Sequence, residues 1–177
     1  MPNDLTEWQA QKRQLTRDAF GKKFAHPFLI RRASSRKDGE SGEGSDFAGE
    51  KLSFHTNVAD GAAAPEVPAG SVRLSGATVL PIVKKPQNPY PDRISLGRAL
   101  NCDVVVRDGT VSKLHGHFKL ITTGEAEFTD RASQNGTKVN GTLLKPEAPK
   151  RVGSGDTIIF GSVAMQFLDP KKLWDLL

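Results

Sequence analysis

Residues 130–144 read DRASQNGTKVNGTLL, and they contain two Asn-Gly dipeptides, Asn135-Gly136 and Asn140-Gly141, five residues apart. Asn-Gly is the strongest short-range signal for a β-hairpin, because both residues tolerate the positive φ angles of a type I′ turn. Only the short segment TKV lies between the two dipeptides as a candidate strand. We therefore expect this stretch to lie at one end of a β-sheet, with polar side chains and backbone N–H groups facing outward.

The sequence around this stretch, from Ala77 onward, consists of short β-rich runs separated by Pro, Gly, Asn and Asp. The runs are ATVLPIV, RISLGR, DVVV, GHFKLI, AEFTD, TKV, TLL, DTIIF and VAMQFL. Many short strands without helical periodicity between them are typical of an antiparallel sandwich or barrel. In GHFKLI, alternation places Phe118 and Leu120 on one face and Lys119 on the other, as in a half-buried strand. The last segment, DPKKLWDLL, predicts a closing helical turn that packs on the sandwich.

The N-terminal segment has a helical pattern. Residues 4–20 place Leu5, Trp8 and Leu15 at helical spacing, which predicts a short amphipathic helix. Its Trp face is expected either to dock on the main domain or to stay partly frayed. The FLI run that follows, residues 28–30, is expected either to add a strand or to anchor the segment.

Charge divides the chain into three parts. Residues 1–37 carry nine Lys or Arg against three Asp or Glu, and residues 38–70 carry one against seven. The acidic part is rich in Gly, Ala, Ser and Pro and has few large apolar residues, so it cannot bury enough surface to offset the entropy of ordering. We expect a basic N-terminal segment (1–37), a flexible acidic linker (38–70) and a β-sandwich (71–177).

Several classes of protein are disfavoured by composition. The single cysteine, Cys102, cannot form an internal disulfide, and the four scattered histidines lack the paired spacing of a zinc site, so we expect no metal and no cofactor. No apolar run approaches the roughly 20 residues of a membrane span, and the N-terminus is polar where a signal peptide would be apolar. The expected location is the cytoplasm, with no membrane partner.

Four motifs within the β-rich region occur in a characteristic order. They are ISLGRALNCDVVV, VSKLHGHFKL, FTDRASQNGTKVNG and GSGDTIIFG. In this order and spacing, the four motifs resemble the pattern of forkhead-associated (FHA) domains, with the match running from about Ala77 to Asp169. The resemblance implies an all-β, antiparallel β-sandwich that binds phosphothreonine peptides.

The residues at the motif ends suit a phosphate ligand. A phosphothreonine carries about −1.5 to −2 charges and three strong acceptor oxygens, so its binding site needs cations and donors that converge. Arg98 offers a guanidinium fork, Ser112 a hydroxyl and a backbone N–H, and Lys113 a second positive charge. Asn135 offers a carboxamide that can bind a peptide main chain. The resemblance implies the same roles: Arg98 and Ser112 on the phosphate, Lys113 assisting, and Asn135 on the peptide backbone.

The resemblance also assigns supporting residues. Gln134 stands where some members have a small hydroxyl residue that lines the pocket for the threonine methyl, so we place it in the peptide-binding site. His115 resembles the scaffold histidine that braces the loops, and Gly97, Gly136 and Asn140 are expected to support the site through backbone conformation. Lys113 is a departure, because many members have Arg there, and Lys keeps the charge but loses the fork.

Alternative functions remain open. The first is a phosphothreonine-binding adaptor in Ser/Thr kinase signalling, whose partner is a phosphothreonine-containing protein such as a kinase or its substrate. The second is a structural or assembly protein with a non-phosphate-binding FHA fold, in which residues 1–37 contact partners or mediate self-association. Nucleic-acid binding is disfavoured by the acidic segment beside the basic one. Catalysis by Ser112 and His115 is disfavoured because no motif places a carboxylate to orient the imidazole, so we expect no enzyme.

Overall fold

The computed structural model describes residues 5–31 and 77–177, which form three short helices and eleven strands. The expected linker, residues 38–70, lies outside the described residues. The helices are α1 (Leu5–Gln14), α2 (Arg17–Lys23) and α3 (Pro170–Leu176). The strands are β1 (Phe28–Arg31), β2 (Thr78–Pro81), β3 (Ile94–Gly97), β4 (Val104–Val105), β5 (Gly116–Leu120), β6 (Glu125–Asp130), β7 (Thr137–Val139), β8 (Thr142–Leu143), β9 (Pro149–Gly153), β10 (Thr157–Phe160) and β11 (Val163–Leu168).

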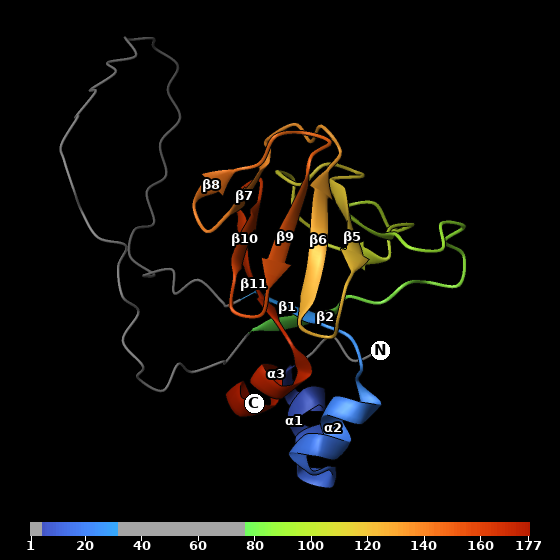
Figure 1. Ribbon diagram of the computed structural model, residues 1–177, viewed down its shortest axis with the longest axis vertical. Helices are drawn as coiled ribbons and strands as arrows, with labels where there is room; N and C mark the ends of the chain where they lie inside the picture. The colour runs from blue at the N-terminus through green and yellow to red at the C-terminus, as the bar shows by residue number, and fades with distance from the viewer. Residues whose placement is uncertain (1–4, 32–76) are drawn as a thin grey trace, which may run out of the picture. The chain divides into compact units, whose positions relative to one another are not determined.

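The strands form two sheets packed face to face (Figure 1). One sheet has the order β2-β1-β11-β10-β7-β8, and the other has the order β4-β3-β5-β6-β9. The strand pairs are antiparallel except for β3 and β4, which run parallel where Leu96 pairs with Val104. The expected all-β sandwich with a short N-terminal helix is confirmed.

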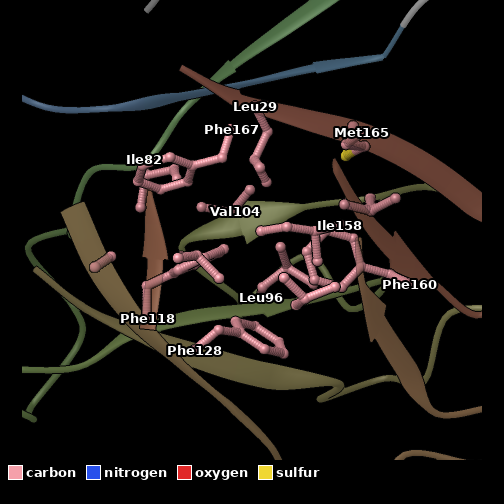
Figure 2. Packing of buried hydrophobic residues seen from close by; sticks show 14 of the residues in the cluster. Leu29, Ile82, Leu96, Val104, Phe118, Phe128, Ile158, Phe160, Met165 and Phe167 are labelled. Atoms are coloured by element: carbon pink, nitrogen blue, oxygen red, sulfur yellow. The ribbon is translucent and has the colours of Figure 1, made fainter. Parts of the chain in front are cut away.

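The core between the sheets follows the alternation of the strands. Figure 2 shows Phe118 and Phe128 from one sheet packing toward Phe160 and Phe167 from the other. Ring centroids lie 4.8 Å apart for Phe118 and Phe128 and 5.3 Å apart for Phe128 and Phe160. In β5, Phe118 is buried while Lys119 is exposed, as the alternation predicts. Aromatic pairs at these distances add to the stabilisation from burial alone.

A second apolar cluster covers the outer face of β1 and β2. Leu29 of β1 faces the sandwich core, whereas its neighbours Phe28 and Ile30 point to the opposite face and pack with the helices. Trp8 of α1 and Phe20 of α2 are fully buried in this second cluster. We call α1, α2, α3 and the residues they cover the helical cap. The predicted docking of the Trp8 face on the main domain is therefore observed.

Three local details differ from the sequence expectations or decide between them. The helical pattern of residues 4–20 forms two helices, because the Thr16 side chain accepts a hydrogen bond from the Ala19 N–H and starts α2 anew. The FLI run is a strand, β1, inserted between β2 and β11. Strand β9 was not expected from the sequence, since it begins with Pro149 and buries Val152 alone among its five residues.

Strand direction brings several connections to one end of the sandwich. The register pairs Leu96 with Gly116, Gly116 with Asp130, and Phe160 with both Thr137 and Val163. We call the four connections at this end the loop rim, namely residues 98–103, 106–115, 131–136 and 161–162. Helix α3 follows the far end of β11, so the helical cap and the loop rim lie at opposite ends of the sandwich (Figure 1).

Candidate functional site

The loop rim begins at Gly97, where β3 meets the loop that contains Ser112. The Arg98 N–H donates to the Ser112 carbonyl at 3.0 Å, and the Ala99 N–H donates to the Lys113 carbonyl at 3.1 Å. A Cβ on Gly97 would lie 2.2 Å from the Lys113 carbonyl oxygen, closer than any real contact. Glycine is therefore required at residue 97 by close backbone approach, which holds Arg98 beside Ser112 and Lys113.

Side-chain bonds tie the next two loops together. The Ser112 Oγ accepts a hydrogen bond from the Gln134 N–H at 3.0 Å, and the Asn135 Nδ2 donates to the Thr110 carbonyl at 2.7 Å. The backbone N–H of Ser112 is not available to a ligand, because it donates to His115 Nδ1 at 3.2 Å. The structure thus brings Arg98, Ser112, Gln134 and Asn135 into one continuous set of loops.

Two cations of the rim have no partner within the described parts of the chain. The side chains of Arg98 and Lys113 are exposed and form no hydrogen bond or ion pair with any residue in 5–31 or 77–177. The carboxylates that Arg98 could have paired with are engaged elsewhere. Asp103 accepts from Ser95 and Asn88, and Asp130 accepts from Ser133 and Thr137. The rim therefore presents unneutralised positive charge, the electrostatic condition for binding an anion.

A buried chain of hydrogen bonds supports the rim from below. Because the Ser112 N–H donates to Nδ1 of His115, the imidazole proton lies on Nε2, which donates to Thr137 Oγ1 at 3.1 Å. The Thr137 hydroxyl donates to Asp130 Oδ2 at 2.5 Å, and Ser133 donates to both oxygens of Asp130. These hydrogen bonds connect the loop of Ser112 to strands β6 and β7 through His115.

On the pKa values of both His115 and Asp130, burial and polar contacts act in opposite directions. Burial lowers the pKa of His115, and the attraction of Asp130 opposes that shift without reversing it. Burial by itself would raise the pKa of Asp130, but hydrogen bonds from Thr137 and Ser133 stabilise the carboxylate and lower its pKa overall. Near neutral pH the pair is a neutral imidazole and an ionised carboxylate, as the hydrogen-bond directions require.

A carboxylate does stand near His115, contrary to the sequence expectation. Asp130 Oδ2 lies 3.7 Å from His115 Nε2, and Ser112 is three residues from His115. The arrangement still differs from a nucleophile, base and orienting acid. His115 faces the backbone N–H of Ser112 rather than its hydroxyl, and the imidazole is fully buried. Neither imidazole nitrogen is placed to take the proton of the Ser112 hydroxyl.

The two Asn-Gly dipeptides have different conformations. Asn140 and Gly141 both have positive φ, 48° and 83°, and join β7 to β8 in the left-handed turn that the sequence predicted. Asn140 also donates to Asp156 and accepts from the Thr157 N–H, so its side chain is occupied. At the first dipeptide Gly136 alone has positive φ, 71°. Asn135 is exposed there, and its carboxamide oxygen forms no bond with the described residues.

The structure adds residues that motif reasoning missed. The Thr110 carbonyl accepts from Asn135, and a Cβ on Gly161 would lie 2.4 Å from that same carbonyl oxygen. Gly161 is the last residue of the motif GSGDTIIFG. A glycine at that place in the motif was the sequence signal for a close backbone contact. Lys85 and Asp103 hold the loop that contains Arg98. Asp103 stands in the first motif, whereas Lys85 gave no motif signal, because it comes from the segment before β3.

The described residues show neither a metal site nor a membrane-spanning helix. No three His, Cys, Asp or Glu side chains in residues 5–31 and 77–177 come together in a way that could hold a metal ion. None of the helices in this part of the chain is long and apolar enough to cross a membrane.

Comparison with known proteins identifies the central part of the chain. The model of the FHA domain family matches residues 94–161, which run from the start of β3 to the turn after β10. A comparison of the sequence with curated proteins gave no match.

Several solved structures resemble the sandwich. The N-terminal FHA domain of Rad53p from S. cerevisiae, in complex with a phosphothreonine peptide, is 23% identical, with a TM-score of 0.40 over 48% of this chain and 73% of that one. The FHA domain of the CT664 protein from Chlamydia trachomatis is 15% identical, with a TM-score of 0.42 over 51% of this chain and 84% of that one. The FHA domain of FhaA is 22% identical, with a TM-score of 0.39 over 45% of this chain and 84% of that one. The FHA family model thus matches residues 94–161 of this chain, and these three solved structures are FHA domains.

Proposed function

We propose that the loop rim binds phosphothreonine in a protein partner and that the protein acts as a cytoplasmic adaptor in Ser/Thr kinase signalling. The observation that carries the proposal is the pair of exposed cations, Arg98 and Lys113, without partners among the described residues, beside a serine hydroxyl and an asparagine amide. The partner is a kinase or a kinase substrate, and the domain captures it without changing it chemically.

Each side chain has a distinct part in this proposal. Arg98 offers two parallel N–H donors to the phosphate oxygens, and Lys113 adds a point charge. The Ser112 Oγ already accepts from the Gln134 N–H, so its own proton is directed to the phosphate. Asn135 has one amide hydrogen on Thr110, which leaves its carboxamide oxygen and second hydrogen for the peptide backbone.

A binding titration tests the proposal. The intact protein is titrated with a degenerate phosphothreonine peptide pool, its phosphoserine counterpart and the unphosphorylated pool. We expect binding that depends on phosphate and is weakened at least about tenfold by Arg98→Ala, since a charge-assisted hydrogen bond contributes about 1.5–3 kcal/mol.

The matched control is Arg107→Ala, another exposed arginine in the loop rim that forms no side-chain bond with the described residues. Both variants lose one positive charge near the rim, so a general electrostatic effect would weaken both. Equal loss in the two variants, or equal affinity for the phosphorylated and unphosphorylated pools, would refute the assignment of Arg98.

The second candidate, a structural or assembly protein that contacts partners through the N-terminal segment, is less well supported. The apolar face of that segment is already buried, because Trp8 and Phe20 lie in the helical cap. Deleting residues 1–37 would not test this candidate cleanly, since the deletion would also remove β1 from between β2 and β11. Exposed residues of α1, such as Glu7 and Arg13, are better targets for substitution.

A further inference from the structure

We propose that Lys85 is a positioning residue that holds the loop of Arg98, residues 98–103, in its ligand-binding shape. Lys85 lies before β3, outside the segment that the FHA family model matches. The inference rests on the proposed function, because it assigns a further residue to the same site.

The contacts of Lys85 converge on this loop. Its Nζ donates to the Leu100 carbonyl at 3.0 Å and also to the Cys102 carbonyl. Its backbone N–H donates to Asp103 Oδ1 at 2.7 Å. Lys85 thus contacts the loop at three residues: it binds the carbonyls of Leu100 and Cys102 and the carboxylate of Asp103.

The loop has few other restraints near its middle. The Leu100 side chain is 69% exposed, so apolar packing does not fix it. The Ala99 N–H and the Cys102 Sγ both bond to the Lys113 carbonyl, which holds the two sides of the loop but not the Leu100 carbonyl. The Cys102 N–H donates to the Ala99 carbonyl at 3.1 Å and closes the turn itself, but it does not bind the Leu100 carbonyl either. Among the described residues, the ammonium of Lys85 is therefore the group that holds the Leu100 carbonyl.

Asp103, which accepts the hydrogen bond of the Lys85 backbone N–H, is itself held by several donors. Asp103 is 9% exposed and accepts hydrogen bonds from the Ser95 N–H, the Ser95 hydroxyl and Asn88 Nδ2 as well as from Lys85. Burial opposes ionisation of Asp103, but these donors outweigh it and lower its pKa, so the carboxylate is ionised at neutral pH. The Lys85 backbone is anchored to a fixed acceptor, and hydrogen bonds with a charged donor, such as those of its ammonium, are roughly twice as strong as neutral ones.

The contacts of Lys85 bear on binding because the side chain of Arg98, unlike its backbone N–H, is not held by any described residue. The Arg98 guanidinium forms no bond within the described residues, so its position depends on the backbone of the loop in which it stands. A loop that samples several shapes lowers the fraction of molecules with Arg98 in place, and the apparent affinity falls by that fraction.

The test compares Lys85→Met with Lys84→Met in the intact protein. Lys84 is the neighbouring lysine, half-buried and without a side-chain bond to the described residues, so both variants lose the same charge in the same segment. The probe is a fluorescein-labelled degenerate phosphothreonine peptide pool, followed by anisotropy. We expect Lys85→Met to weaken binding about tenfold and Lys84→Met less than about twofold. Lys85→Arg should restore most of the affinity.

A double variant shows whether Lys85 acts through Arg98. If it does, Lys85→Met should have no further effect on binding once Arg98 is alanine. Amide hydrogen exchange without peptide gives an independent readout: Lys85→Met should accelerate exchange in residues 98–103 and leave the sandwich core unchanged.

Each other outcome overturns a defined claim. Equal effects of Lys84→Met and Lys85→Met, additive losses in the double variant, or faster exchange throughout the sandwich would overturn the positioning role alone. Absence of phosphate-dependent binding by the unmodified protein would overturn the proposed function and this inference with it.

Discussion

The helical cap at one end of the sandwich and the loop rim at the other are stabilised by different interactions. At the helical cap, Trp8, Phe20 and Phe28 are fully buried, and Trp8 makes edge-to-face contacts with both phenylalanines. At the loop rim, Arg98 and Lys113 are exposed, and backbone hydrogen bonds hold the loops that contain them. Apolar burial stabilises the first end, whereas directional bonds at the second leave the charged side chains available. Stability and binding should therefore respond separately to substitution at the two ends.

The largest expected effect is on stability at the helical cap. Trp8 lies 4.9 Å from Phe24 and 5.1 Å from Phe28 between ring centroids and is fully buried. Trp8→Ala should lower the free energy of unfolding by about 3–5 kcal/mol, measured by urea denaturation. Where the variant remains folded, its affinity for phosphothreonine peptide should be unchanged.

The control for this prediction is Trp174→Ala in α3, where the side chain is only half-buried. A smaller loss of stability is expected there because less surface returns to water. Equal losses in the two variants would mean that the helical cap does not depend on the Trp8 cluster.

Gly97→Ala should affect both stability and binding, because it changes the backbone that positions the rim. The added Cβ would lie 2.2 Å from a backbone oxygen of Lys113, so β3 and the loop after β4 must separate. We expect a loss of about 1–3 kcal/mol in unfolding free energy together with weakened phosphopeptide binding. Gly109→Ala in the same loop has no atom within 4 Å of its new Cβ, and unchanged behaviour is expected.

Arg98→Ala should weaken peptide binding and leave stability nearly unchanged, whereas Trp8→Ala should lower stability and leave binding unchanged. Arg98 is exposed and forms no bond with the described residues, so the unfolding free energy should change by less than about 0.5 kcal/mol. The phosphopeptide affinity should still fall at least about tenfold. A large loss of stability would contradict the separation between the two ends.

The two Asn-Gly dipeptides lie at opposite ends of β7 and allow a finer comparison. Asn140→Ala removes bonds to Asp156 and Thr157 at a positive φ, and should cost about 1–2 kcal/mol of stability without affecting peptide affinity. Asn135→Ala should cost less than about 1 kcal/mol while weakening peptide binding. Denaturation and anisotropy measured on both variants would contradict this assignment if the two effects were exchanged.

The smallest expected effect is a pH dependence of stability. His115 has a folded-state pKa below its unfolded value of 6.5, so the unfolded state gains a proton first as the pH falls. Stability from the neutral imidazole is fully present above about pH 6.5 and is lost as the pH falls toward the folded pKa. His26 and His117 have lowered pKa values too and act in the same direction.

The melting temperature should therefore decrease between pH 7.5 and 5.5, and an NMR titration should show His115 protonating below pH 6.5. Asp103 and Asp130 have lowered pKa values and stay ionised throughout this range, so they contribute nothing to the change. A melting temperature that rises on acidification would refute the neutral state of the buried histidines.

The sequence predicted the strands whose side chains alternate, and it failed where the pattern was weak. β5 was predictable because Phe118 alternates with Lys119. β9 was not, since a strand at a sheet edge can bury a single residue, Val152, and still pair along its length with β6. The break between α1 and α2 was also missed. The Thr16 cap forms only when α2 packs in the helical cap through Phe20, and that packing is a tertiary contact.

The candidate site was predictable as a set of residue types and not as a set of contacts. Arg98, Ser112, Lys113 and Asn135 stand in motifs whose order and spacing are visible in one dimension. The engagement of the Ser112 N–H by His115 and the donation from Lys85 to the Leu100 carbonyl involve backbone atoms. Every residue has these backbone atoms, so the residue type does not predict which of them form such bonds.

By itself, the sequence determined the sandwich, the FHA pattern and the positive residues at its strand ends, because alternation, turn residues and charge are local properties. The tertiary structure decided that Arg98 has no carboxylate partner among residues 5–31 and 77–177, while Asp103 and Asp130 are engaged inside the domain. It also decided that residues 28–31 form a strand between β2 and β11, which puts the helices at the end away from the loop rim. These outcomes depend on which groups meet across the fold, since burial and hydrogen bonding act between residues far apart in the chain.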